Sequence, residues 1–222
     1  MQWLAAFVMR GRVQAASVTA AFAALPLLSW FSGAAVGLVT LRRGPAEGLL
    51  TLAIGGLLLF VLGQIGAAGG SALALTGLVY WIPVAALATV LRSTRSLALA
   101  LETGMLVAAV ALVVQYLISA DPVAFWQEAL KPLADSLVES QVLPVQDADL
   151  IAREIAAWMP GMISTAVFMQ AVISLLIGRW WQSLLYNPGG FRSEFHALRL
   201  SRLSALVVAP LMILLLTGLA GG

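Results

Sequence analysis

The sequence contains no cysteine and one histidine, His196, among its 222 residues. The lack of cysteine excludes disulfides, Cys-ligated zinc, iron–sulfur clusters and thiol catalysis. One histidine is too few for a histidine-rich metal site. The apolar stretches contain no paired carboxylates, and only the neighbouring Ser164 and Thr165 leave a hydroxyl nucleophile open. We therefore expect a protein that is not an enzyme and that holds no metal or cofactor.

Charge is also scarce, at 10% of residues, whereas hydrophobic residues make up 61%. Soluble domains are roughly 25% charged and roughly 45–50% apolar. A globular fold of this length needs a polar exterior, so a soluble enzyme, a secreted all-β module and a disordered chain are excluded. We predict an all-α polytopic transmembrane helical bundle whose first partner is the lipid bilayer. A pI near 9.5 suggests nucleic acid binding in a soluble protein, but in a membrane protein it does not, so we expect no nucleic acid partner.

Long apolar runs predict the membrane spans, because a hydrocarbon core of about 30 Å needs about 20 helical residues. Five runs qualify on length and lack of charge: residues 46–66, 71–91, 96–118, 157–178 and 203–220. Residues 13–41 are also uncharged and contain Pro26, which removes a helical hydrogen bond. We expect two short helices there, 13–27 and 30–41, in an N-terminal hairpin, which gives six to seven spans. The alternative is one long, tilted and kinked helix.

The arginines predict the orientation, because positive residues mark the cytoplasmic side. With the hairpin, ten of them fall on one side: Arg10, Arg12, Arg42, Arg43, Arg92, Arg95, Arg179, Arg192, Arg199 and Arg202. The opposite side receives the long segment 119–156, which holds most of the acidic residues. We predict a protein of the bacterial inner membrane with a cytoplasmic N-terminus, an extracytoplasmic C-terminus and a cytoplasmic basic loop over 179–202.

Within the predicted extracytoplasmic segment 119–156, we expect an outer amphipathic helix over 121–140. Asp121 is suited to cap it, with Pro122 at its first position. One face carries four apolar residues at helical spacing: Trp126, Leu130, Leu133 and Leu137. Pro144 ends this helix, and Asp147 caps a second one that continues through Trp158 into the next span. The outer helix packs on the protein or lies in the headgroup layer; the alternative is a lid over an outward cavity.

Glu102 is the one ionisable group deep within a predicted span, where function is the default hypothesis. It binds a ligand or a proton, or it pairs with Arg95 two helical turns earlier. Pro83 kinks a nearby span. We expect a candidate ligand cavity among six polar or aromatic residues: Glu102, Tyr80, Trp81, Gln170, Gln115 and Gln64. The alternative is that these side chains only join neighbouring helices.

Two further features are candidates for binding a membrane partner. The first is a set of small residues at four-residue spacing, Ala16, Ala20 and Ala24, followed by Gly33 and Gly37. We expect internal helix packing there, with docking on a second membrane protein as the alternative. The second is the basic loop, where Trp180, Trp181 and Tyr186 suit an interfacial belt and Ser193 caps a short helix. Its turn combines proline and glycine as a type II turn does. The candidate partner residues here are Asn187, Pro188, Gly189, Gly190, Phe191 and Arg192.

Three stretches, FVMRGRVQAA (7–16), LRRG (41–44) and WWQSLLYNPGGFRSEFHALRLS (180–201), resemble the YybS-like uncharacterised membrane proteins of bacteria. That family is similar in fold to the S components of energy-coupling-factor vitamin transporters. The resemblance implies a small helical bundle that binds a ligand from the outside and docks on a membrane subunit through an Ala-x-x-x-Ala face, which Ala16, Ala20 and Ala24 match. The predicted C-terminus departs from S components, whose two ends are both cytoplasmic.

Two functions follow from these features. The first is a small-molecule binding or transport subunit that resembles an S component. The second is a non-catalytic membrane scaffold or assembly partner that acts through the 179–202 loop.

Overall fold

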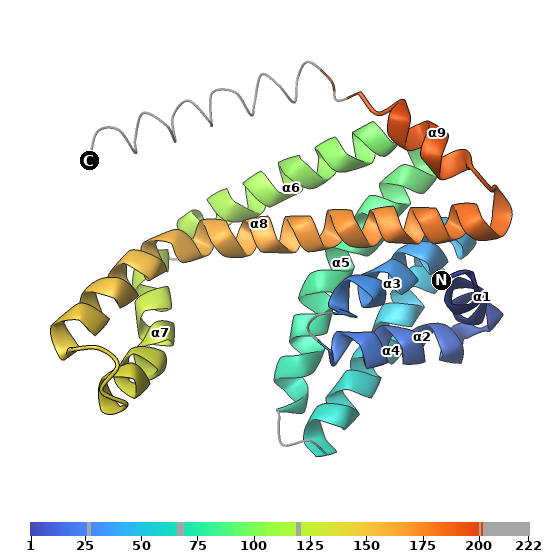
Figure 1. Cartoon of the computed structure of the whole chain (residues 1–222). Helices are drawn as coiled ribbons and strands as arrows, with labels where there is room; N and C mark the ends of the chain where they lie inside the picture. The colour runs from blue at the N-terminus through green and yellow to red at the C-terminus, as the bar shows by residue number, and fades with distance from the viewer. Residues whose placement is uncertain (26–27, 66–68, 119–120, 200, 202–222) are drawn as a thin grey trace. The chain divides into compact units, whose positions relative to one another are not determined.

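The computed structural model describes residues 1–25, 28–65, 69–118, 121–199 and 201. Within these residues all regular structure is α-helical, as predicted (Figure 1). The helices are α1 (Gln2–Arg10), α2 (Arg12–Ala23), α3 (Ser29–Arg43), α4 (Pro45–Ile65), α5 (Gly70–Thr94), α6 (Leu97–Ile118), α7 (Pro122–Glu139), α8 (Val145–Tyr186) and α9 (Gly190–His196).

The chain divides into two compact units, which are described separately. The first unit comprises Met1–Gly104 together with Gln170–Gly222, and the second comprises Met105–Met169. Helices α6 and α8 therefore contribute residues to both units.

Four of the described helices, α4, α5, α6 and α8, are long and apolar enough to cross a membrane. They confirm helices at four of the predicted spans. The fifth, 203–220, lies outside the described residues. Helices α2 and α3 confirm a break within 13–41, although Pro26 itself is not described. At 1.5 Å per residue they are about 18 and 22 Å long, short of a full hydrocarbon core.

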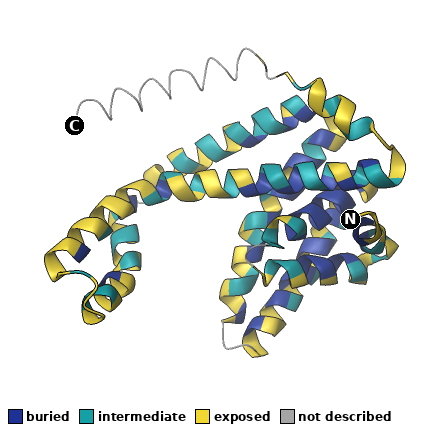
Figure 2. Cartoon of the chain, viewed as in Figure 1, coloured by how far each residue is buried: buried dark blue, intermediate teal, exposed yellow. Residues whose placement is uncertain are grey.

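The first unit is built on α2, α3, α4 and α5, which pack against one another with α1 beside α2 (Figure 1). Their facing sides carry the buried residues, as Figure 2 shows. Close approach depends on small residues, because a Cβ at Gly178 of α8 would lie 2.9 Å from the Ala34 carbonyl of α3. Gly33 and Gly37 of α3 likewise meet Val84 of α5 and Ser174 of α8. The prediction that this glycine pair packs internally is confirmed.

The predicted basic segment 179–202 is helical in its first part. Helix α8 continues to Tyr186, and a turn then leads into α9. Trp181 is fully buried against α1, α2 and α3 and stacks on Phe31 at 6.0 Å, so it is not an interfacial belt residue. Arg179 did not end the helix because a charge ends an apolar run without breaking its backbone hydrogen bonds.

In the second unit, α7 confirms the helix predicted over 121–140. Asp121 Oδ1 accepts a 2.9 Å hydrogen bond from the Ala124 amide, and Pro122 is the first helical residue. The predicted cap at Asp147 is wrong, because α8 begins at Val145 and its first amides donate to the Pro144 carbonyl. Leu133 departs from the predicted apolar face and is 57% exposed.

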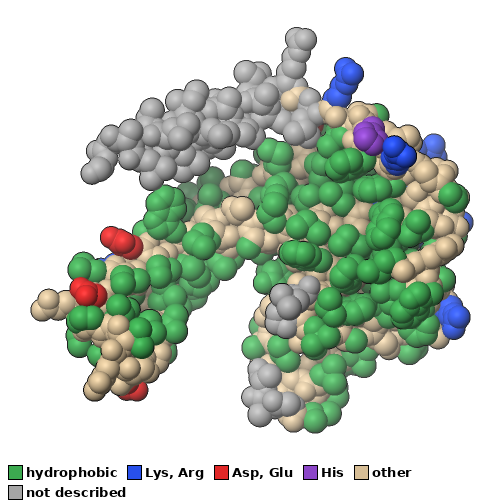
Figure 3. All heavy atoms as spheres, viewed as in Figure 1, with side chains coloured by type: hydrophobic (Ala, Val, Ile, Leu, Met, Phe, Trp, Pro, Cys, Tyr) green, Lys and Arg blue, Asp and Glu red, His purple; other side chains and the backbone are tan. Residues whose placement is uncertain are grey.

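The exterior is largely apolar, as expected for a chain surrounded by lipid. Large aliphatic side chains are exposed along three candidate spans, among them Leu57 on α4, Ile82 on α5 and Val107 on α6. On the face drawn in Figure 3, hydrophobic side chains cover most of the first unit, and its arginine side chains, in blue, lie toward one side.

Candidate functional site

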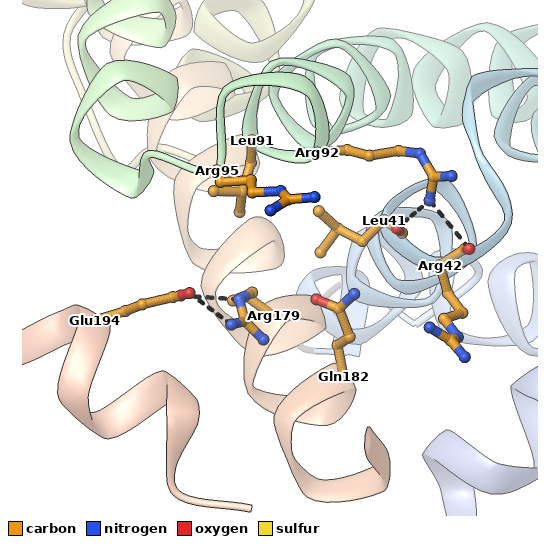
Figure 4. Close-up of a pocket in the computed structure, with 8 residues that line it drawn as sticks. All are labelled: Leu41, Arg42, Leu91, Arg92, Arg95, Arg179, Gln182 and Glu194. Carbon is orange, nitrogen blue, oxygen red and sulfur yellow. Dashed lines mark hydrogen bonds and ion pairs between the residues drawn. The ribbon is translucent and has the colours of Figure 1, made fainter. Parts of the chain in front are cut away.

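A cavity of about 520 Å³ opens in the first unit where α3, α5, α8 and α9 meet (Figure 4). We call it the arginine pocket, and its lining residues are Leu41, Arg42, Leu91, Arg92, Arg95, Arg179, Gln182 and Glu194. The sequence predicted these arginines on one side of the membrane, and the structure places four of them around one space. Four guanidinium groups face one carboxylate, so the lining carries an excess of positive charge.

Arg92 is held by the end of α3. Its Nη1 donates to the carbonyls of Leu41 and Arg42, at 2.6 and 3.0 Å. These carbonyls belong to the last turn of α3, where no amide of the helix is left to bond them. A cation also interacts favourably with the negative end of the helix dipole. Arg92 therefore fixes the ends of α3 and α5 beside each other and forms one wall of the pocket.

Arg42 lies over an aromatic ring. Its guanidinium carbon is 4.2 Å from the centre of the Tyr186 ring. A cation over an aromatic face is attracted by the negative face of the ring. The contact joins the end of α3 to the last residue of α8.

Arg179 of α8 makes a two-pronged ion pair with Glu194 of α9. Nε and Nη2 donate to Oε2 and Oε1 at 2.9 and 2.6 Å. The Arg179 side chain is 12% exposed and that of Glu194 is 36% exposed. A planar guanidinium matches a carboxylate in this geometry, so the pair fixes orientation as well as charge.

A tight turn places α9 over the pocket. The Gly190 amide donates to the Asn187 carbonyl at 3.0 Å, and Gly189 has a φ of 87°. Pro188 and Gly189 thus occupy the central positions of a type II turn, as predicted. Ser183 Oγ donates to the Asn187 carbonyl at 2.7 Å and ties the turn to α8. The predicted cap at Ser193 is wrong, because α9 begins three residues earlier, at Gly190.

Arg95 follows the last residue of α5 in the left-handed conformation, with φ 54° and ψ 23°. Glycine is the usual residue at such a helix end, because a Cβ is strained there. Among the residues that the structure describes, the Arg95 guanidinium has no hydrogen-bond or ion-pair partner. Figure 4 shows it pointing toward the space that Arg179 and Gln182 also face. Within the described part of the chain, Arg95 is thus the pocket arginine without a partner.

Two of the predicted ligand residues, Tyr80 and Trp81, lie together in a different place. They line a cavity of about 40 Å³ between α2, α3, α4 and α5. Trp81 is 1% exposed, and its Nε1 donates to Ser32 Oγ at 2.8 Å. Ser32 Oγ in turn donates to the Thr19 carbonyl at 2.6 Å. The cavity has room for about one water molecule, so these bonds join helices.

The other predicted ligand residues do not line that cavity. Glu102 accepts a hydrogen bond from the Ser201 amide, and the expected ion pair with Arg95 is absent from the described ion pairs. Gln170 is buried, with its Nε2 3.5 Å from Ser174 Oγ. In the second unit, Gln115 Nε2 donates to Ser164 Oγ at 3.0 Å. Gln64, near the end of α4, is exposed.

The predicted partner residues divide by exposure. Ala16 and Ala20 are buried within the first unit, where they pack against its own helices, whereas Ala24 is exposed at the end of α2. The turn from Asn187 to Gly189 is exposed, as is Arg192, and the Phe191 ring lies 5.7 Å from that of Phe195. The turn and α9 are therefore accessible, and the alanine face is largely occupied.

No family model, curated protein or solved structure matches the chain. The described part of the chain also contains no group of three His, Cys, Asp or Glu residues placed to hold a metal.

The sequence did not predict the pocket as a site, because each arginine had a sufficient explanation as a marker of the cytoplasmic side. One signal was available. Arg95 stands four residues after Leu91, the last residue of an apolar run, and two residues before the next run begins at Leu97. A helix end at this place favours glycine. An arginine at that position costs stability, which a topology marker does not require.

Proposed function

We propose that this chain is a non-catalytic inner-membrane protein that binds a small anionic molecule in the arginine pocket, as a binding or transport subunit. The observation that carries the proposal is the pocket itself. Its volume of about 520 Å³ falls within the range of small-molecule sites, about 300–1,000 Å³. Four arginines line it, and one of them, Arg95, has no partner among the described residues.

The pocket belongs to the arginine-rich end of the first unit. By the positive-inside rule this end faces the cytoplasm, with the N-terminus on the same side. The ion pair of Arg12 with Glu47, at 2.5 Å, and the bond from Arg43 to the Met9 carbonyl, at 2.6 Å, gather further arginines around this end. The YybS-like resemblance and the likeness to S components agree with a binding subunit, but S components take their ligand from the outside. We place the ligand of the arginine pocket on the cytoplasmic side.

A scaffold role is the second candidate, favoured by the accessibility of the turn and of α9. Phe195 and Arg192 are both exposed on α9, and Arg192 has no hydrogen-bond or ion-pair partner among the described residues. In this alternative a second membrane subunit contacts Asn187, Pro188, Gly189, Gly190, Phe191 and Arg192.

Native mass spectrometry of the full chain, extracted in a mild uncharged detergent, tests the proposal. We expect a bound small molecule on the wild type that Arg95→Gln loses. Arg153→Gln is the matched control, since it removes the same charge from an exposed position in the second unit. A wild type without any bound small molecule contradicts the proposal. A co-purifying protein that Phe191→Ala releases, with no small molecule bound, favours the scaffold.

A further inference from the structure

We propose that the arginine pocket recognises a phosphate group, and that this phosphate takes the place of the Glu194 carboxylate on Arg179. The inference rests on the proposed function, since it names the chemical class of the ligand for the same pocket. It also assigns to Glu194 the role of an internal competitor that occupies the site when the ligand is absent.

The charge of the lining favours a dianion. Four arginines and one glutamate leave an excess of three positive charges around the space. A monocarboxylate neutralises one of them, whereas a phosphate monoester carries about 1.5 to 2 negative charges at neutral pH. Arginine is the residue that proteins use for planar, forked recognition of phosphate oxygens.

The present hydrogen bonds leave two arginines for the phosphate. Arg92 is engaged with the carbonyls of α3, and Arg42 is engaged with the Tyr186 ring. Arg95 is uncommitted within the described residues, and Arg179 is bound only by an exchangeable carboxylate. A phosphate has enough oxygens to accept hydrogen bonds from Arg95 and Arg179 at the same time. The Glu194 carboxylate accepts hydrogen bonds from Arg179 alone.

The Glu194 carboxylate occupies the hydrogen-bonding position on Arg179 that we assign to the phosphate. Its two oxygens accept from Nε and Nη2 of Arg179, which is the fork that a phosphate would also occupy. It is carried by α9, a helix of seven residues in which none is buried. Few packing contacts therefore hold α9, so the ion pair is a main attachment of this helix to α8. When phosphate occupies Arg179, Glu194 is released and α9 loses this attachment.

The phosphate has two sources that share this chemistry, a soluble phosphate ester and the headgroup of an anionic lipid. Basic pockets at the cytoplasmic membrane surface bind the headgroups of anionic lipids. Arginine recognises the phosphate oxygens of a soluble ester by the same forked geometry. The experiment therefore tests phosphate itself first and separates the two sources in a second arm.

The first arm is isothermal titration of inorganic phosphate into the full chain in an uncharged maltoside detergent. We expect Arg95→Gln to weaken binding about 10- to 100-fold, the loss of one hydrogen bond to a charged group. We expect Glu194→Gln to tighten binding, because the competing carboxylate is gone. Arg153→Gln, which removes a charge from an exposed position in the second unit, is the control and should change affinity by about twofold or less, because exposed charges are screened.

The second arm compares nanodiscs of phosphatidylcholine alone with nanodiscs that also contain phosphatidic acid. Phosphatidic acid that abolishes the phosphate titration identifies the lipid headgroup as the source. A titration that persists, and that glycerol 3-phosphate displaces, identifies a soluble ester. Either result supports the phosphate class.

Two results overturn the inference and separate it from the proposed function. If neither the wild type nor Glu194→Gln binds phosphate or phosphatidic acid, while native mass spectrometry finds another bound molecule, the phosphate class is wrong and the binding function stands. If Glu194→Gln binds phosphate no more tightly than the wild type, Glu194 is not a competitor. The proposed function itself fails when native mass spectrometry finds no small molecule bound to the wild type.

Discussion

Glu194 and Arg179 lie 15 positions apart in the chain and face each other through two hydrogen bonds, at 2.9 and 2.6 Å. The pair joins α9 to α8 and neutralises one of the four arginines of the pocket. Of the four pocket arginines, Arg95 is then the one without a hydrogen-bond, ion-pair or aromatic-ring partner among the described residues. The account of function depends on this division of the arginines between structural contacts and an open position.

Replacing Arg95 by glycine should stabilise the protein and weaken its binding of anions. The left-handed backbone at this position costs a non-glycine residue about 1–2 kcal/mol, and glycine removes that cost. We expect the free energy of unfolding to rise by about 1 kcal/mol, measured by denaturant titration of the detergent-solubilised chain. Arg95→Gln keeps the strain and separates the two effects. A destabilised Arg95→Gly variant would show that the arginine side chain holds the fold.

Replacing Ser32 by alanine should destabilise the first unit. The buried Trp81 Nε1 loses its acceptor, and an unsatisfied buried donor costs about 1–3 kcal/mol. Thermal unfolding followed by tryptophan fluorescence measures the loss. Ser93→Ala is the control, because Ser93 is exposed and bonds only to a carbonyl of its own helix. Equal stability of the two variants would contradict the role given to the Ser32 bond.

Adding one methyl group to α8 should have opposite effects at two glycines. At Gly178 the new Cβ would lie 2.9 Å from the Ala34 carbonyl, and forcing atoms into a packed interface costs about 1–3 kcal/mol. At Gly161 the new Cβ meets nothing within 4 Å, so Gly161→Ala should gain up to about 1 kcal/mol from helix propensity. Size-exclusion recovery after heating compares the two variants. A tolerated Gly178→Ala would mean that α3 and α8 are not in tight contact.

The orientation is testable by cysteine labelling, because the sequence has no cysteine of its own. Ser140→Cys and Ser193→Cys place thiols at two exposed positions, after α7 and on α9. We expect a membrane-impermeant maleimide to label Ser140→Cys in intact spheroplasts, and Ser193→Cys only after the membrane is opened. The reverse pattern would place the arginine pocket on the outer side.

Much of the fold could be predicted from the sequence, because hydrophobic length and charge placement have direct physical causes. The predicted spans 46–66, 71–91 and 96–118 match α4, α5 and α6 to within a few residues. The break within 13–41 was predicted from Pro26. A single span there would also have placed Arg10 and Arg12 on the side opposite the other arginines, against the positive-inside rule.

The site was harder to predict, since contacts between distant residues decide it. Arg179 ended the predicted span, whereas α8 continues to Tyr186, because a charge does not break the backbone hydrogen bonds of a helix. The Arg179 charge is paired with Glu194 of α9, a contact between separate helices. Trp181 was assigned to the interface, but it lies on the side of α8 that meets α1, α2 and α3. The polar residues Tyr80, Gln115 and Gln170 were candidate ligand contacts. In the structure Gln115 and Gln170 lie near serine hydroxyls, and Tyr80 lines a cavity of about 40 Å³.

The most direct test of the account is the distance between α9 and the end of α5 as phosphate is added. Spin labels on Ser93→Cys and Ser193→Cys, both exposed and both in the first unit, report this distance by pulsed electron resonance. The account predicts that the distance distribution shifts or broadens as inorganic phosphate saturates the pocket, and that Glu194→Gln shows the altered distribution without phosphate. A distribution that stays unchanged at phosphate concentrations where titration shows binding would contradict the exchange of Glu194 for phosphate on Arg179.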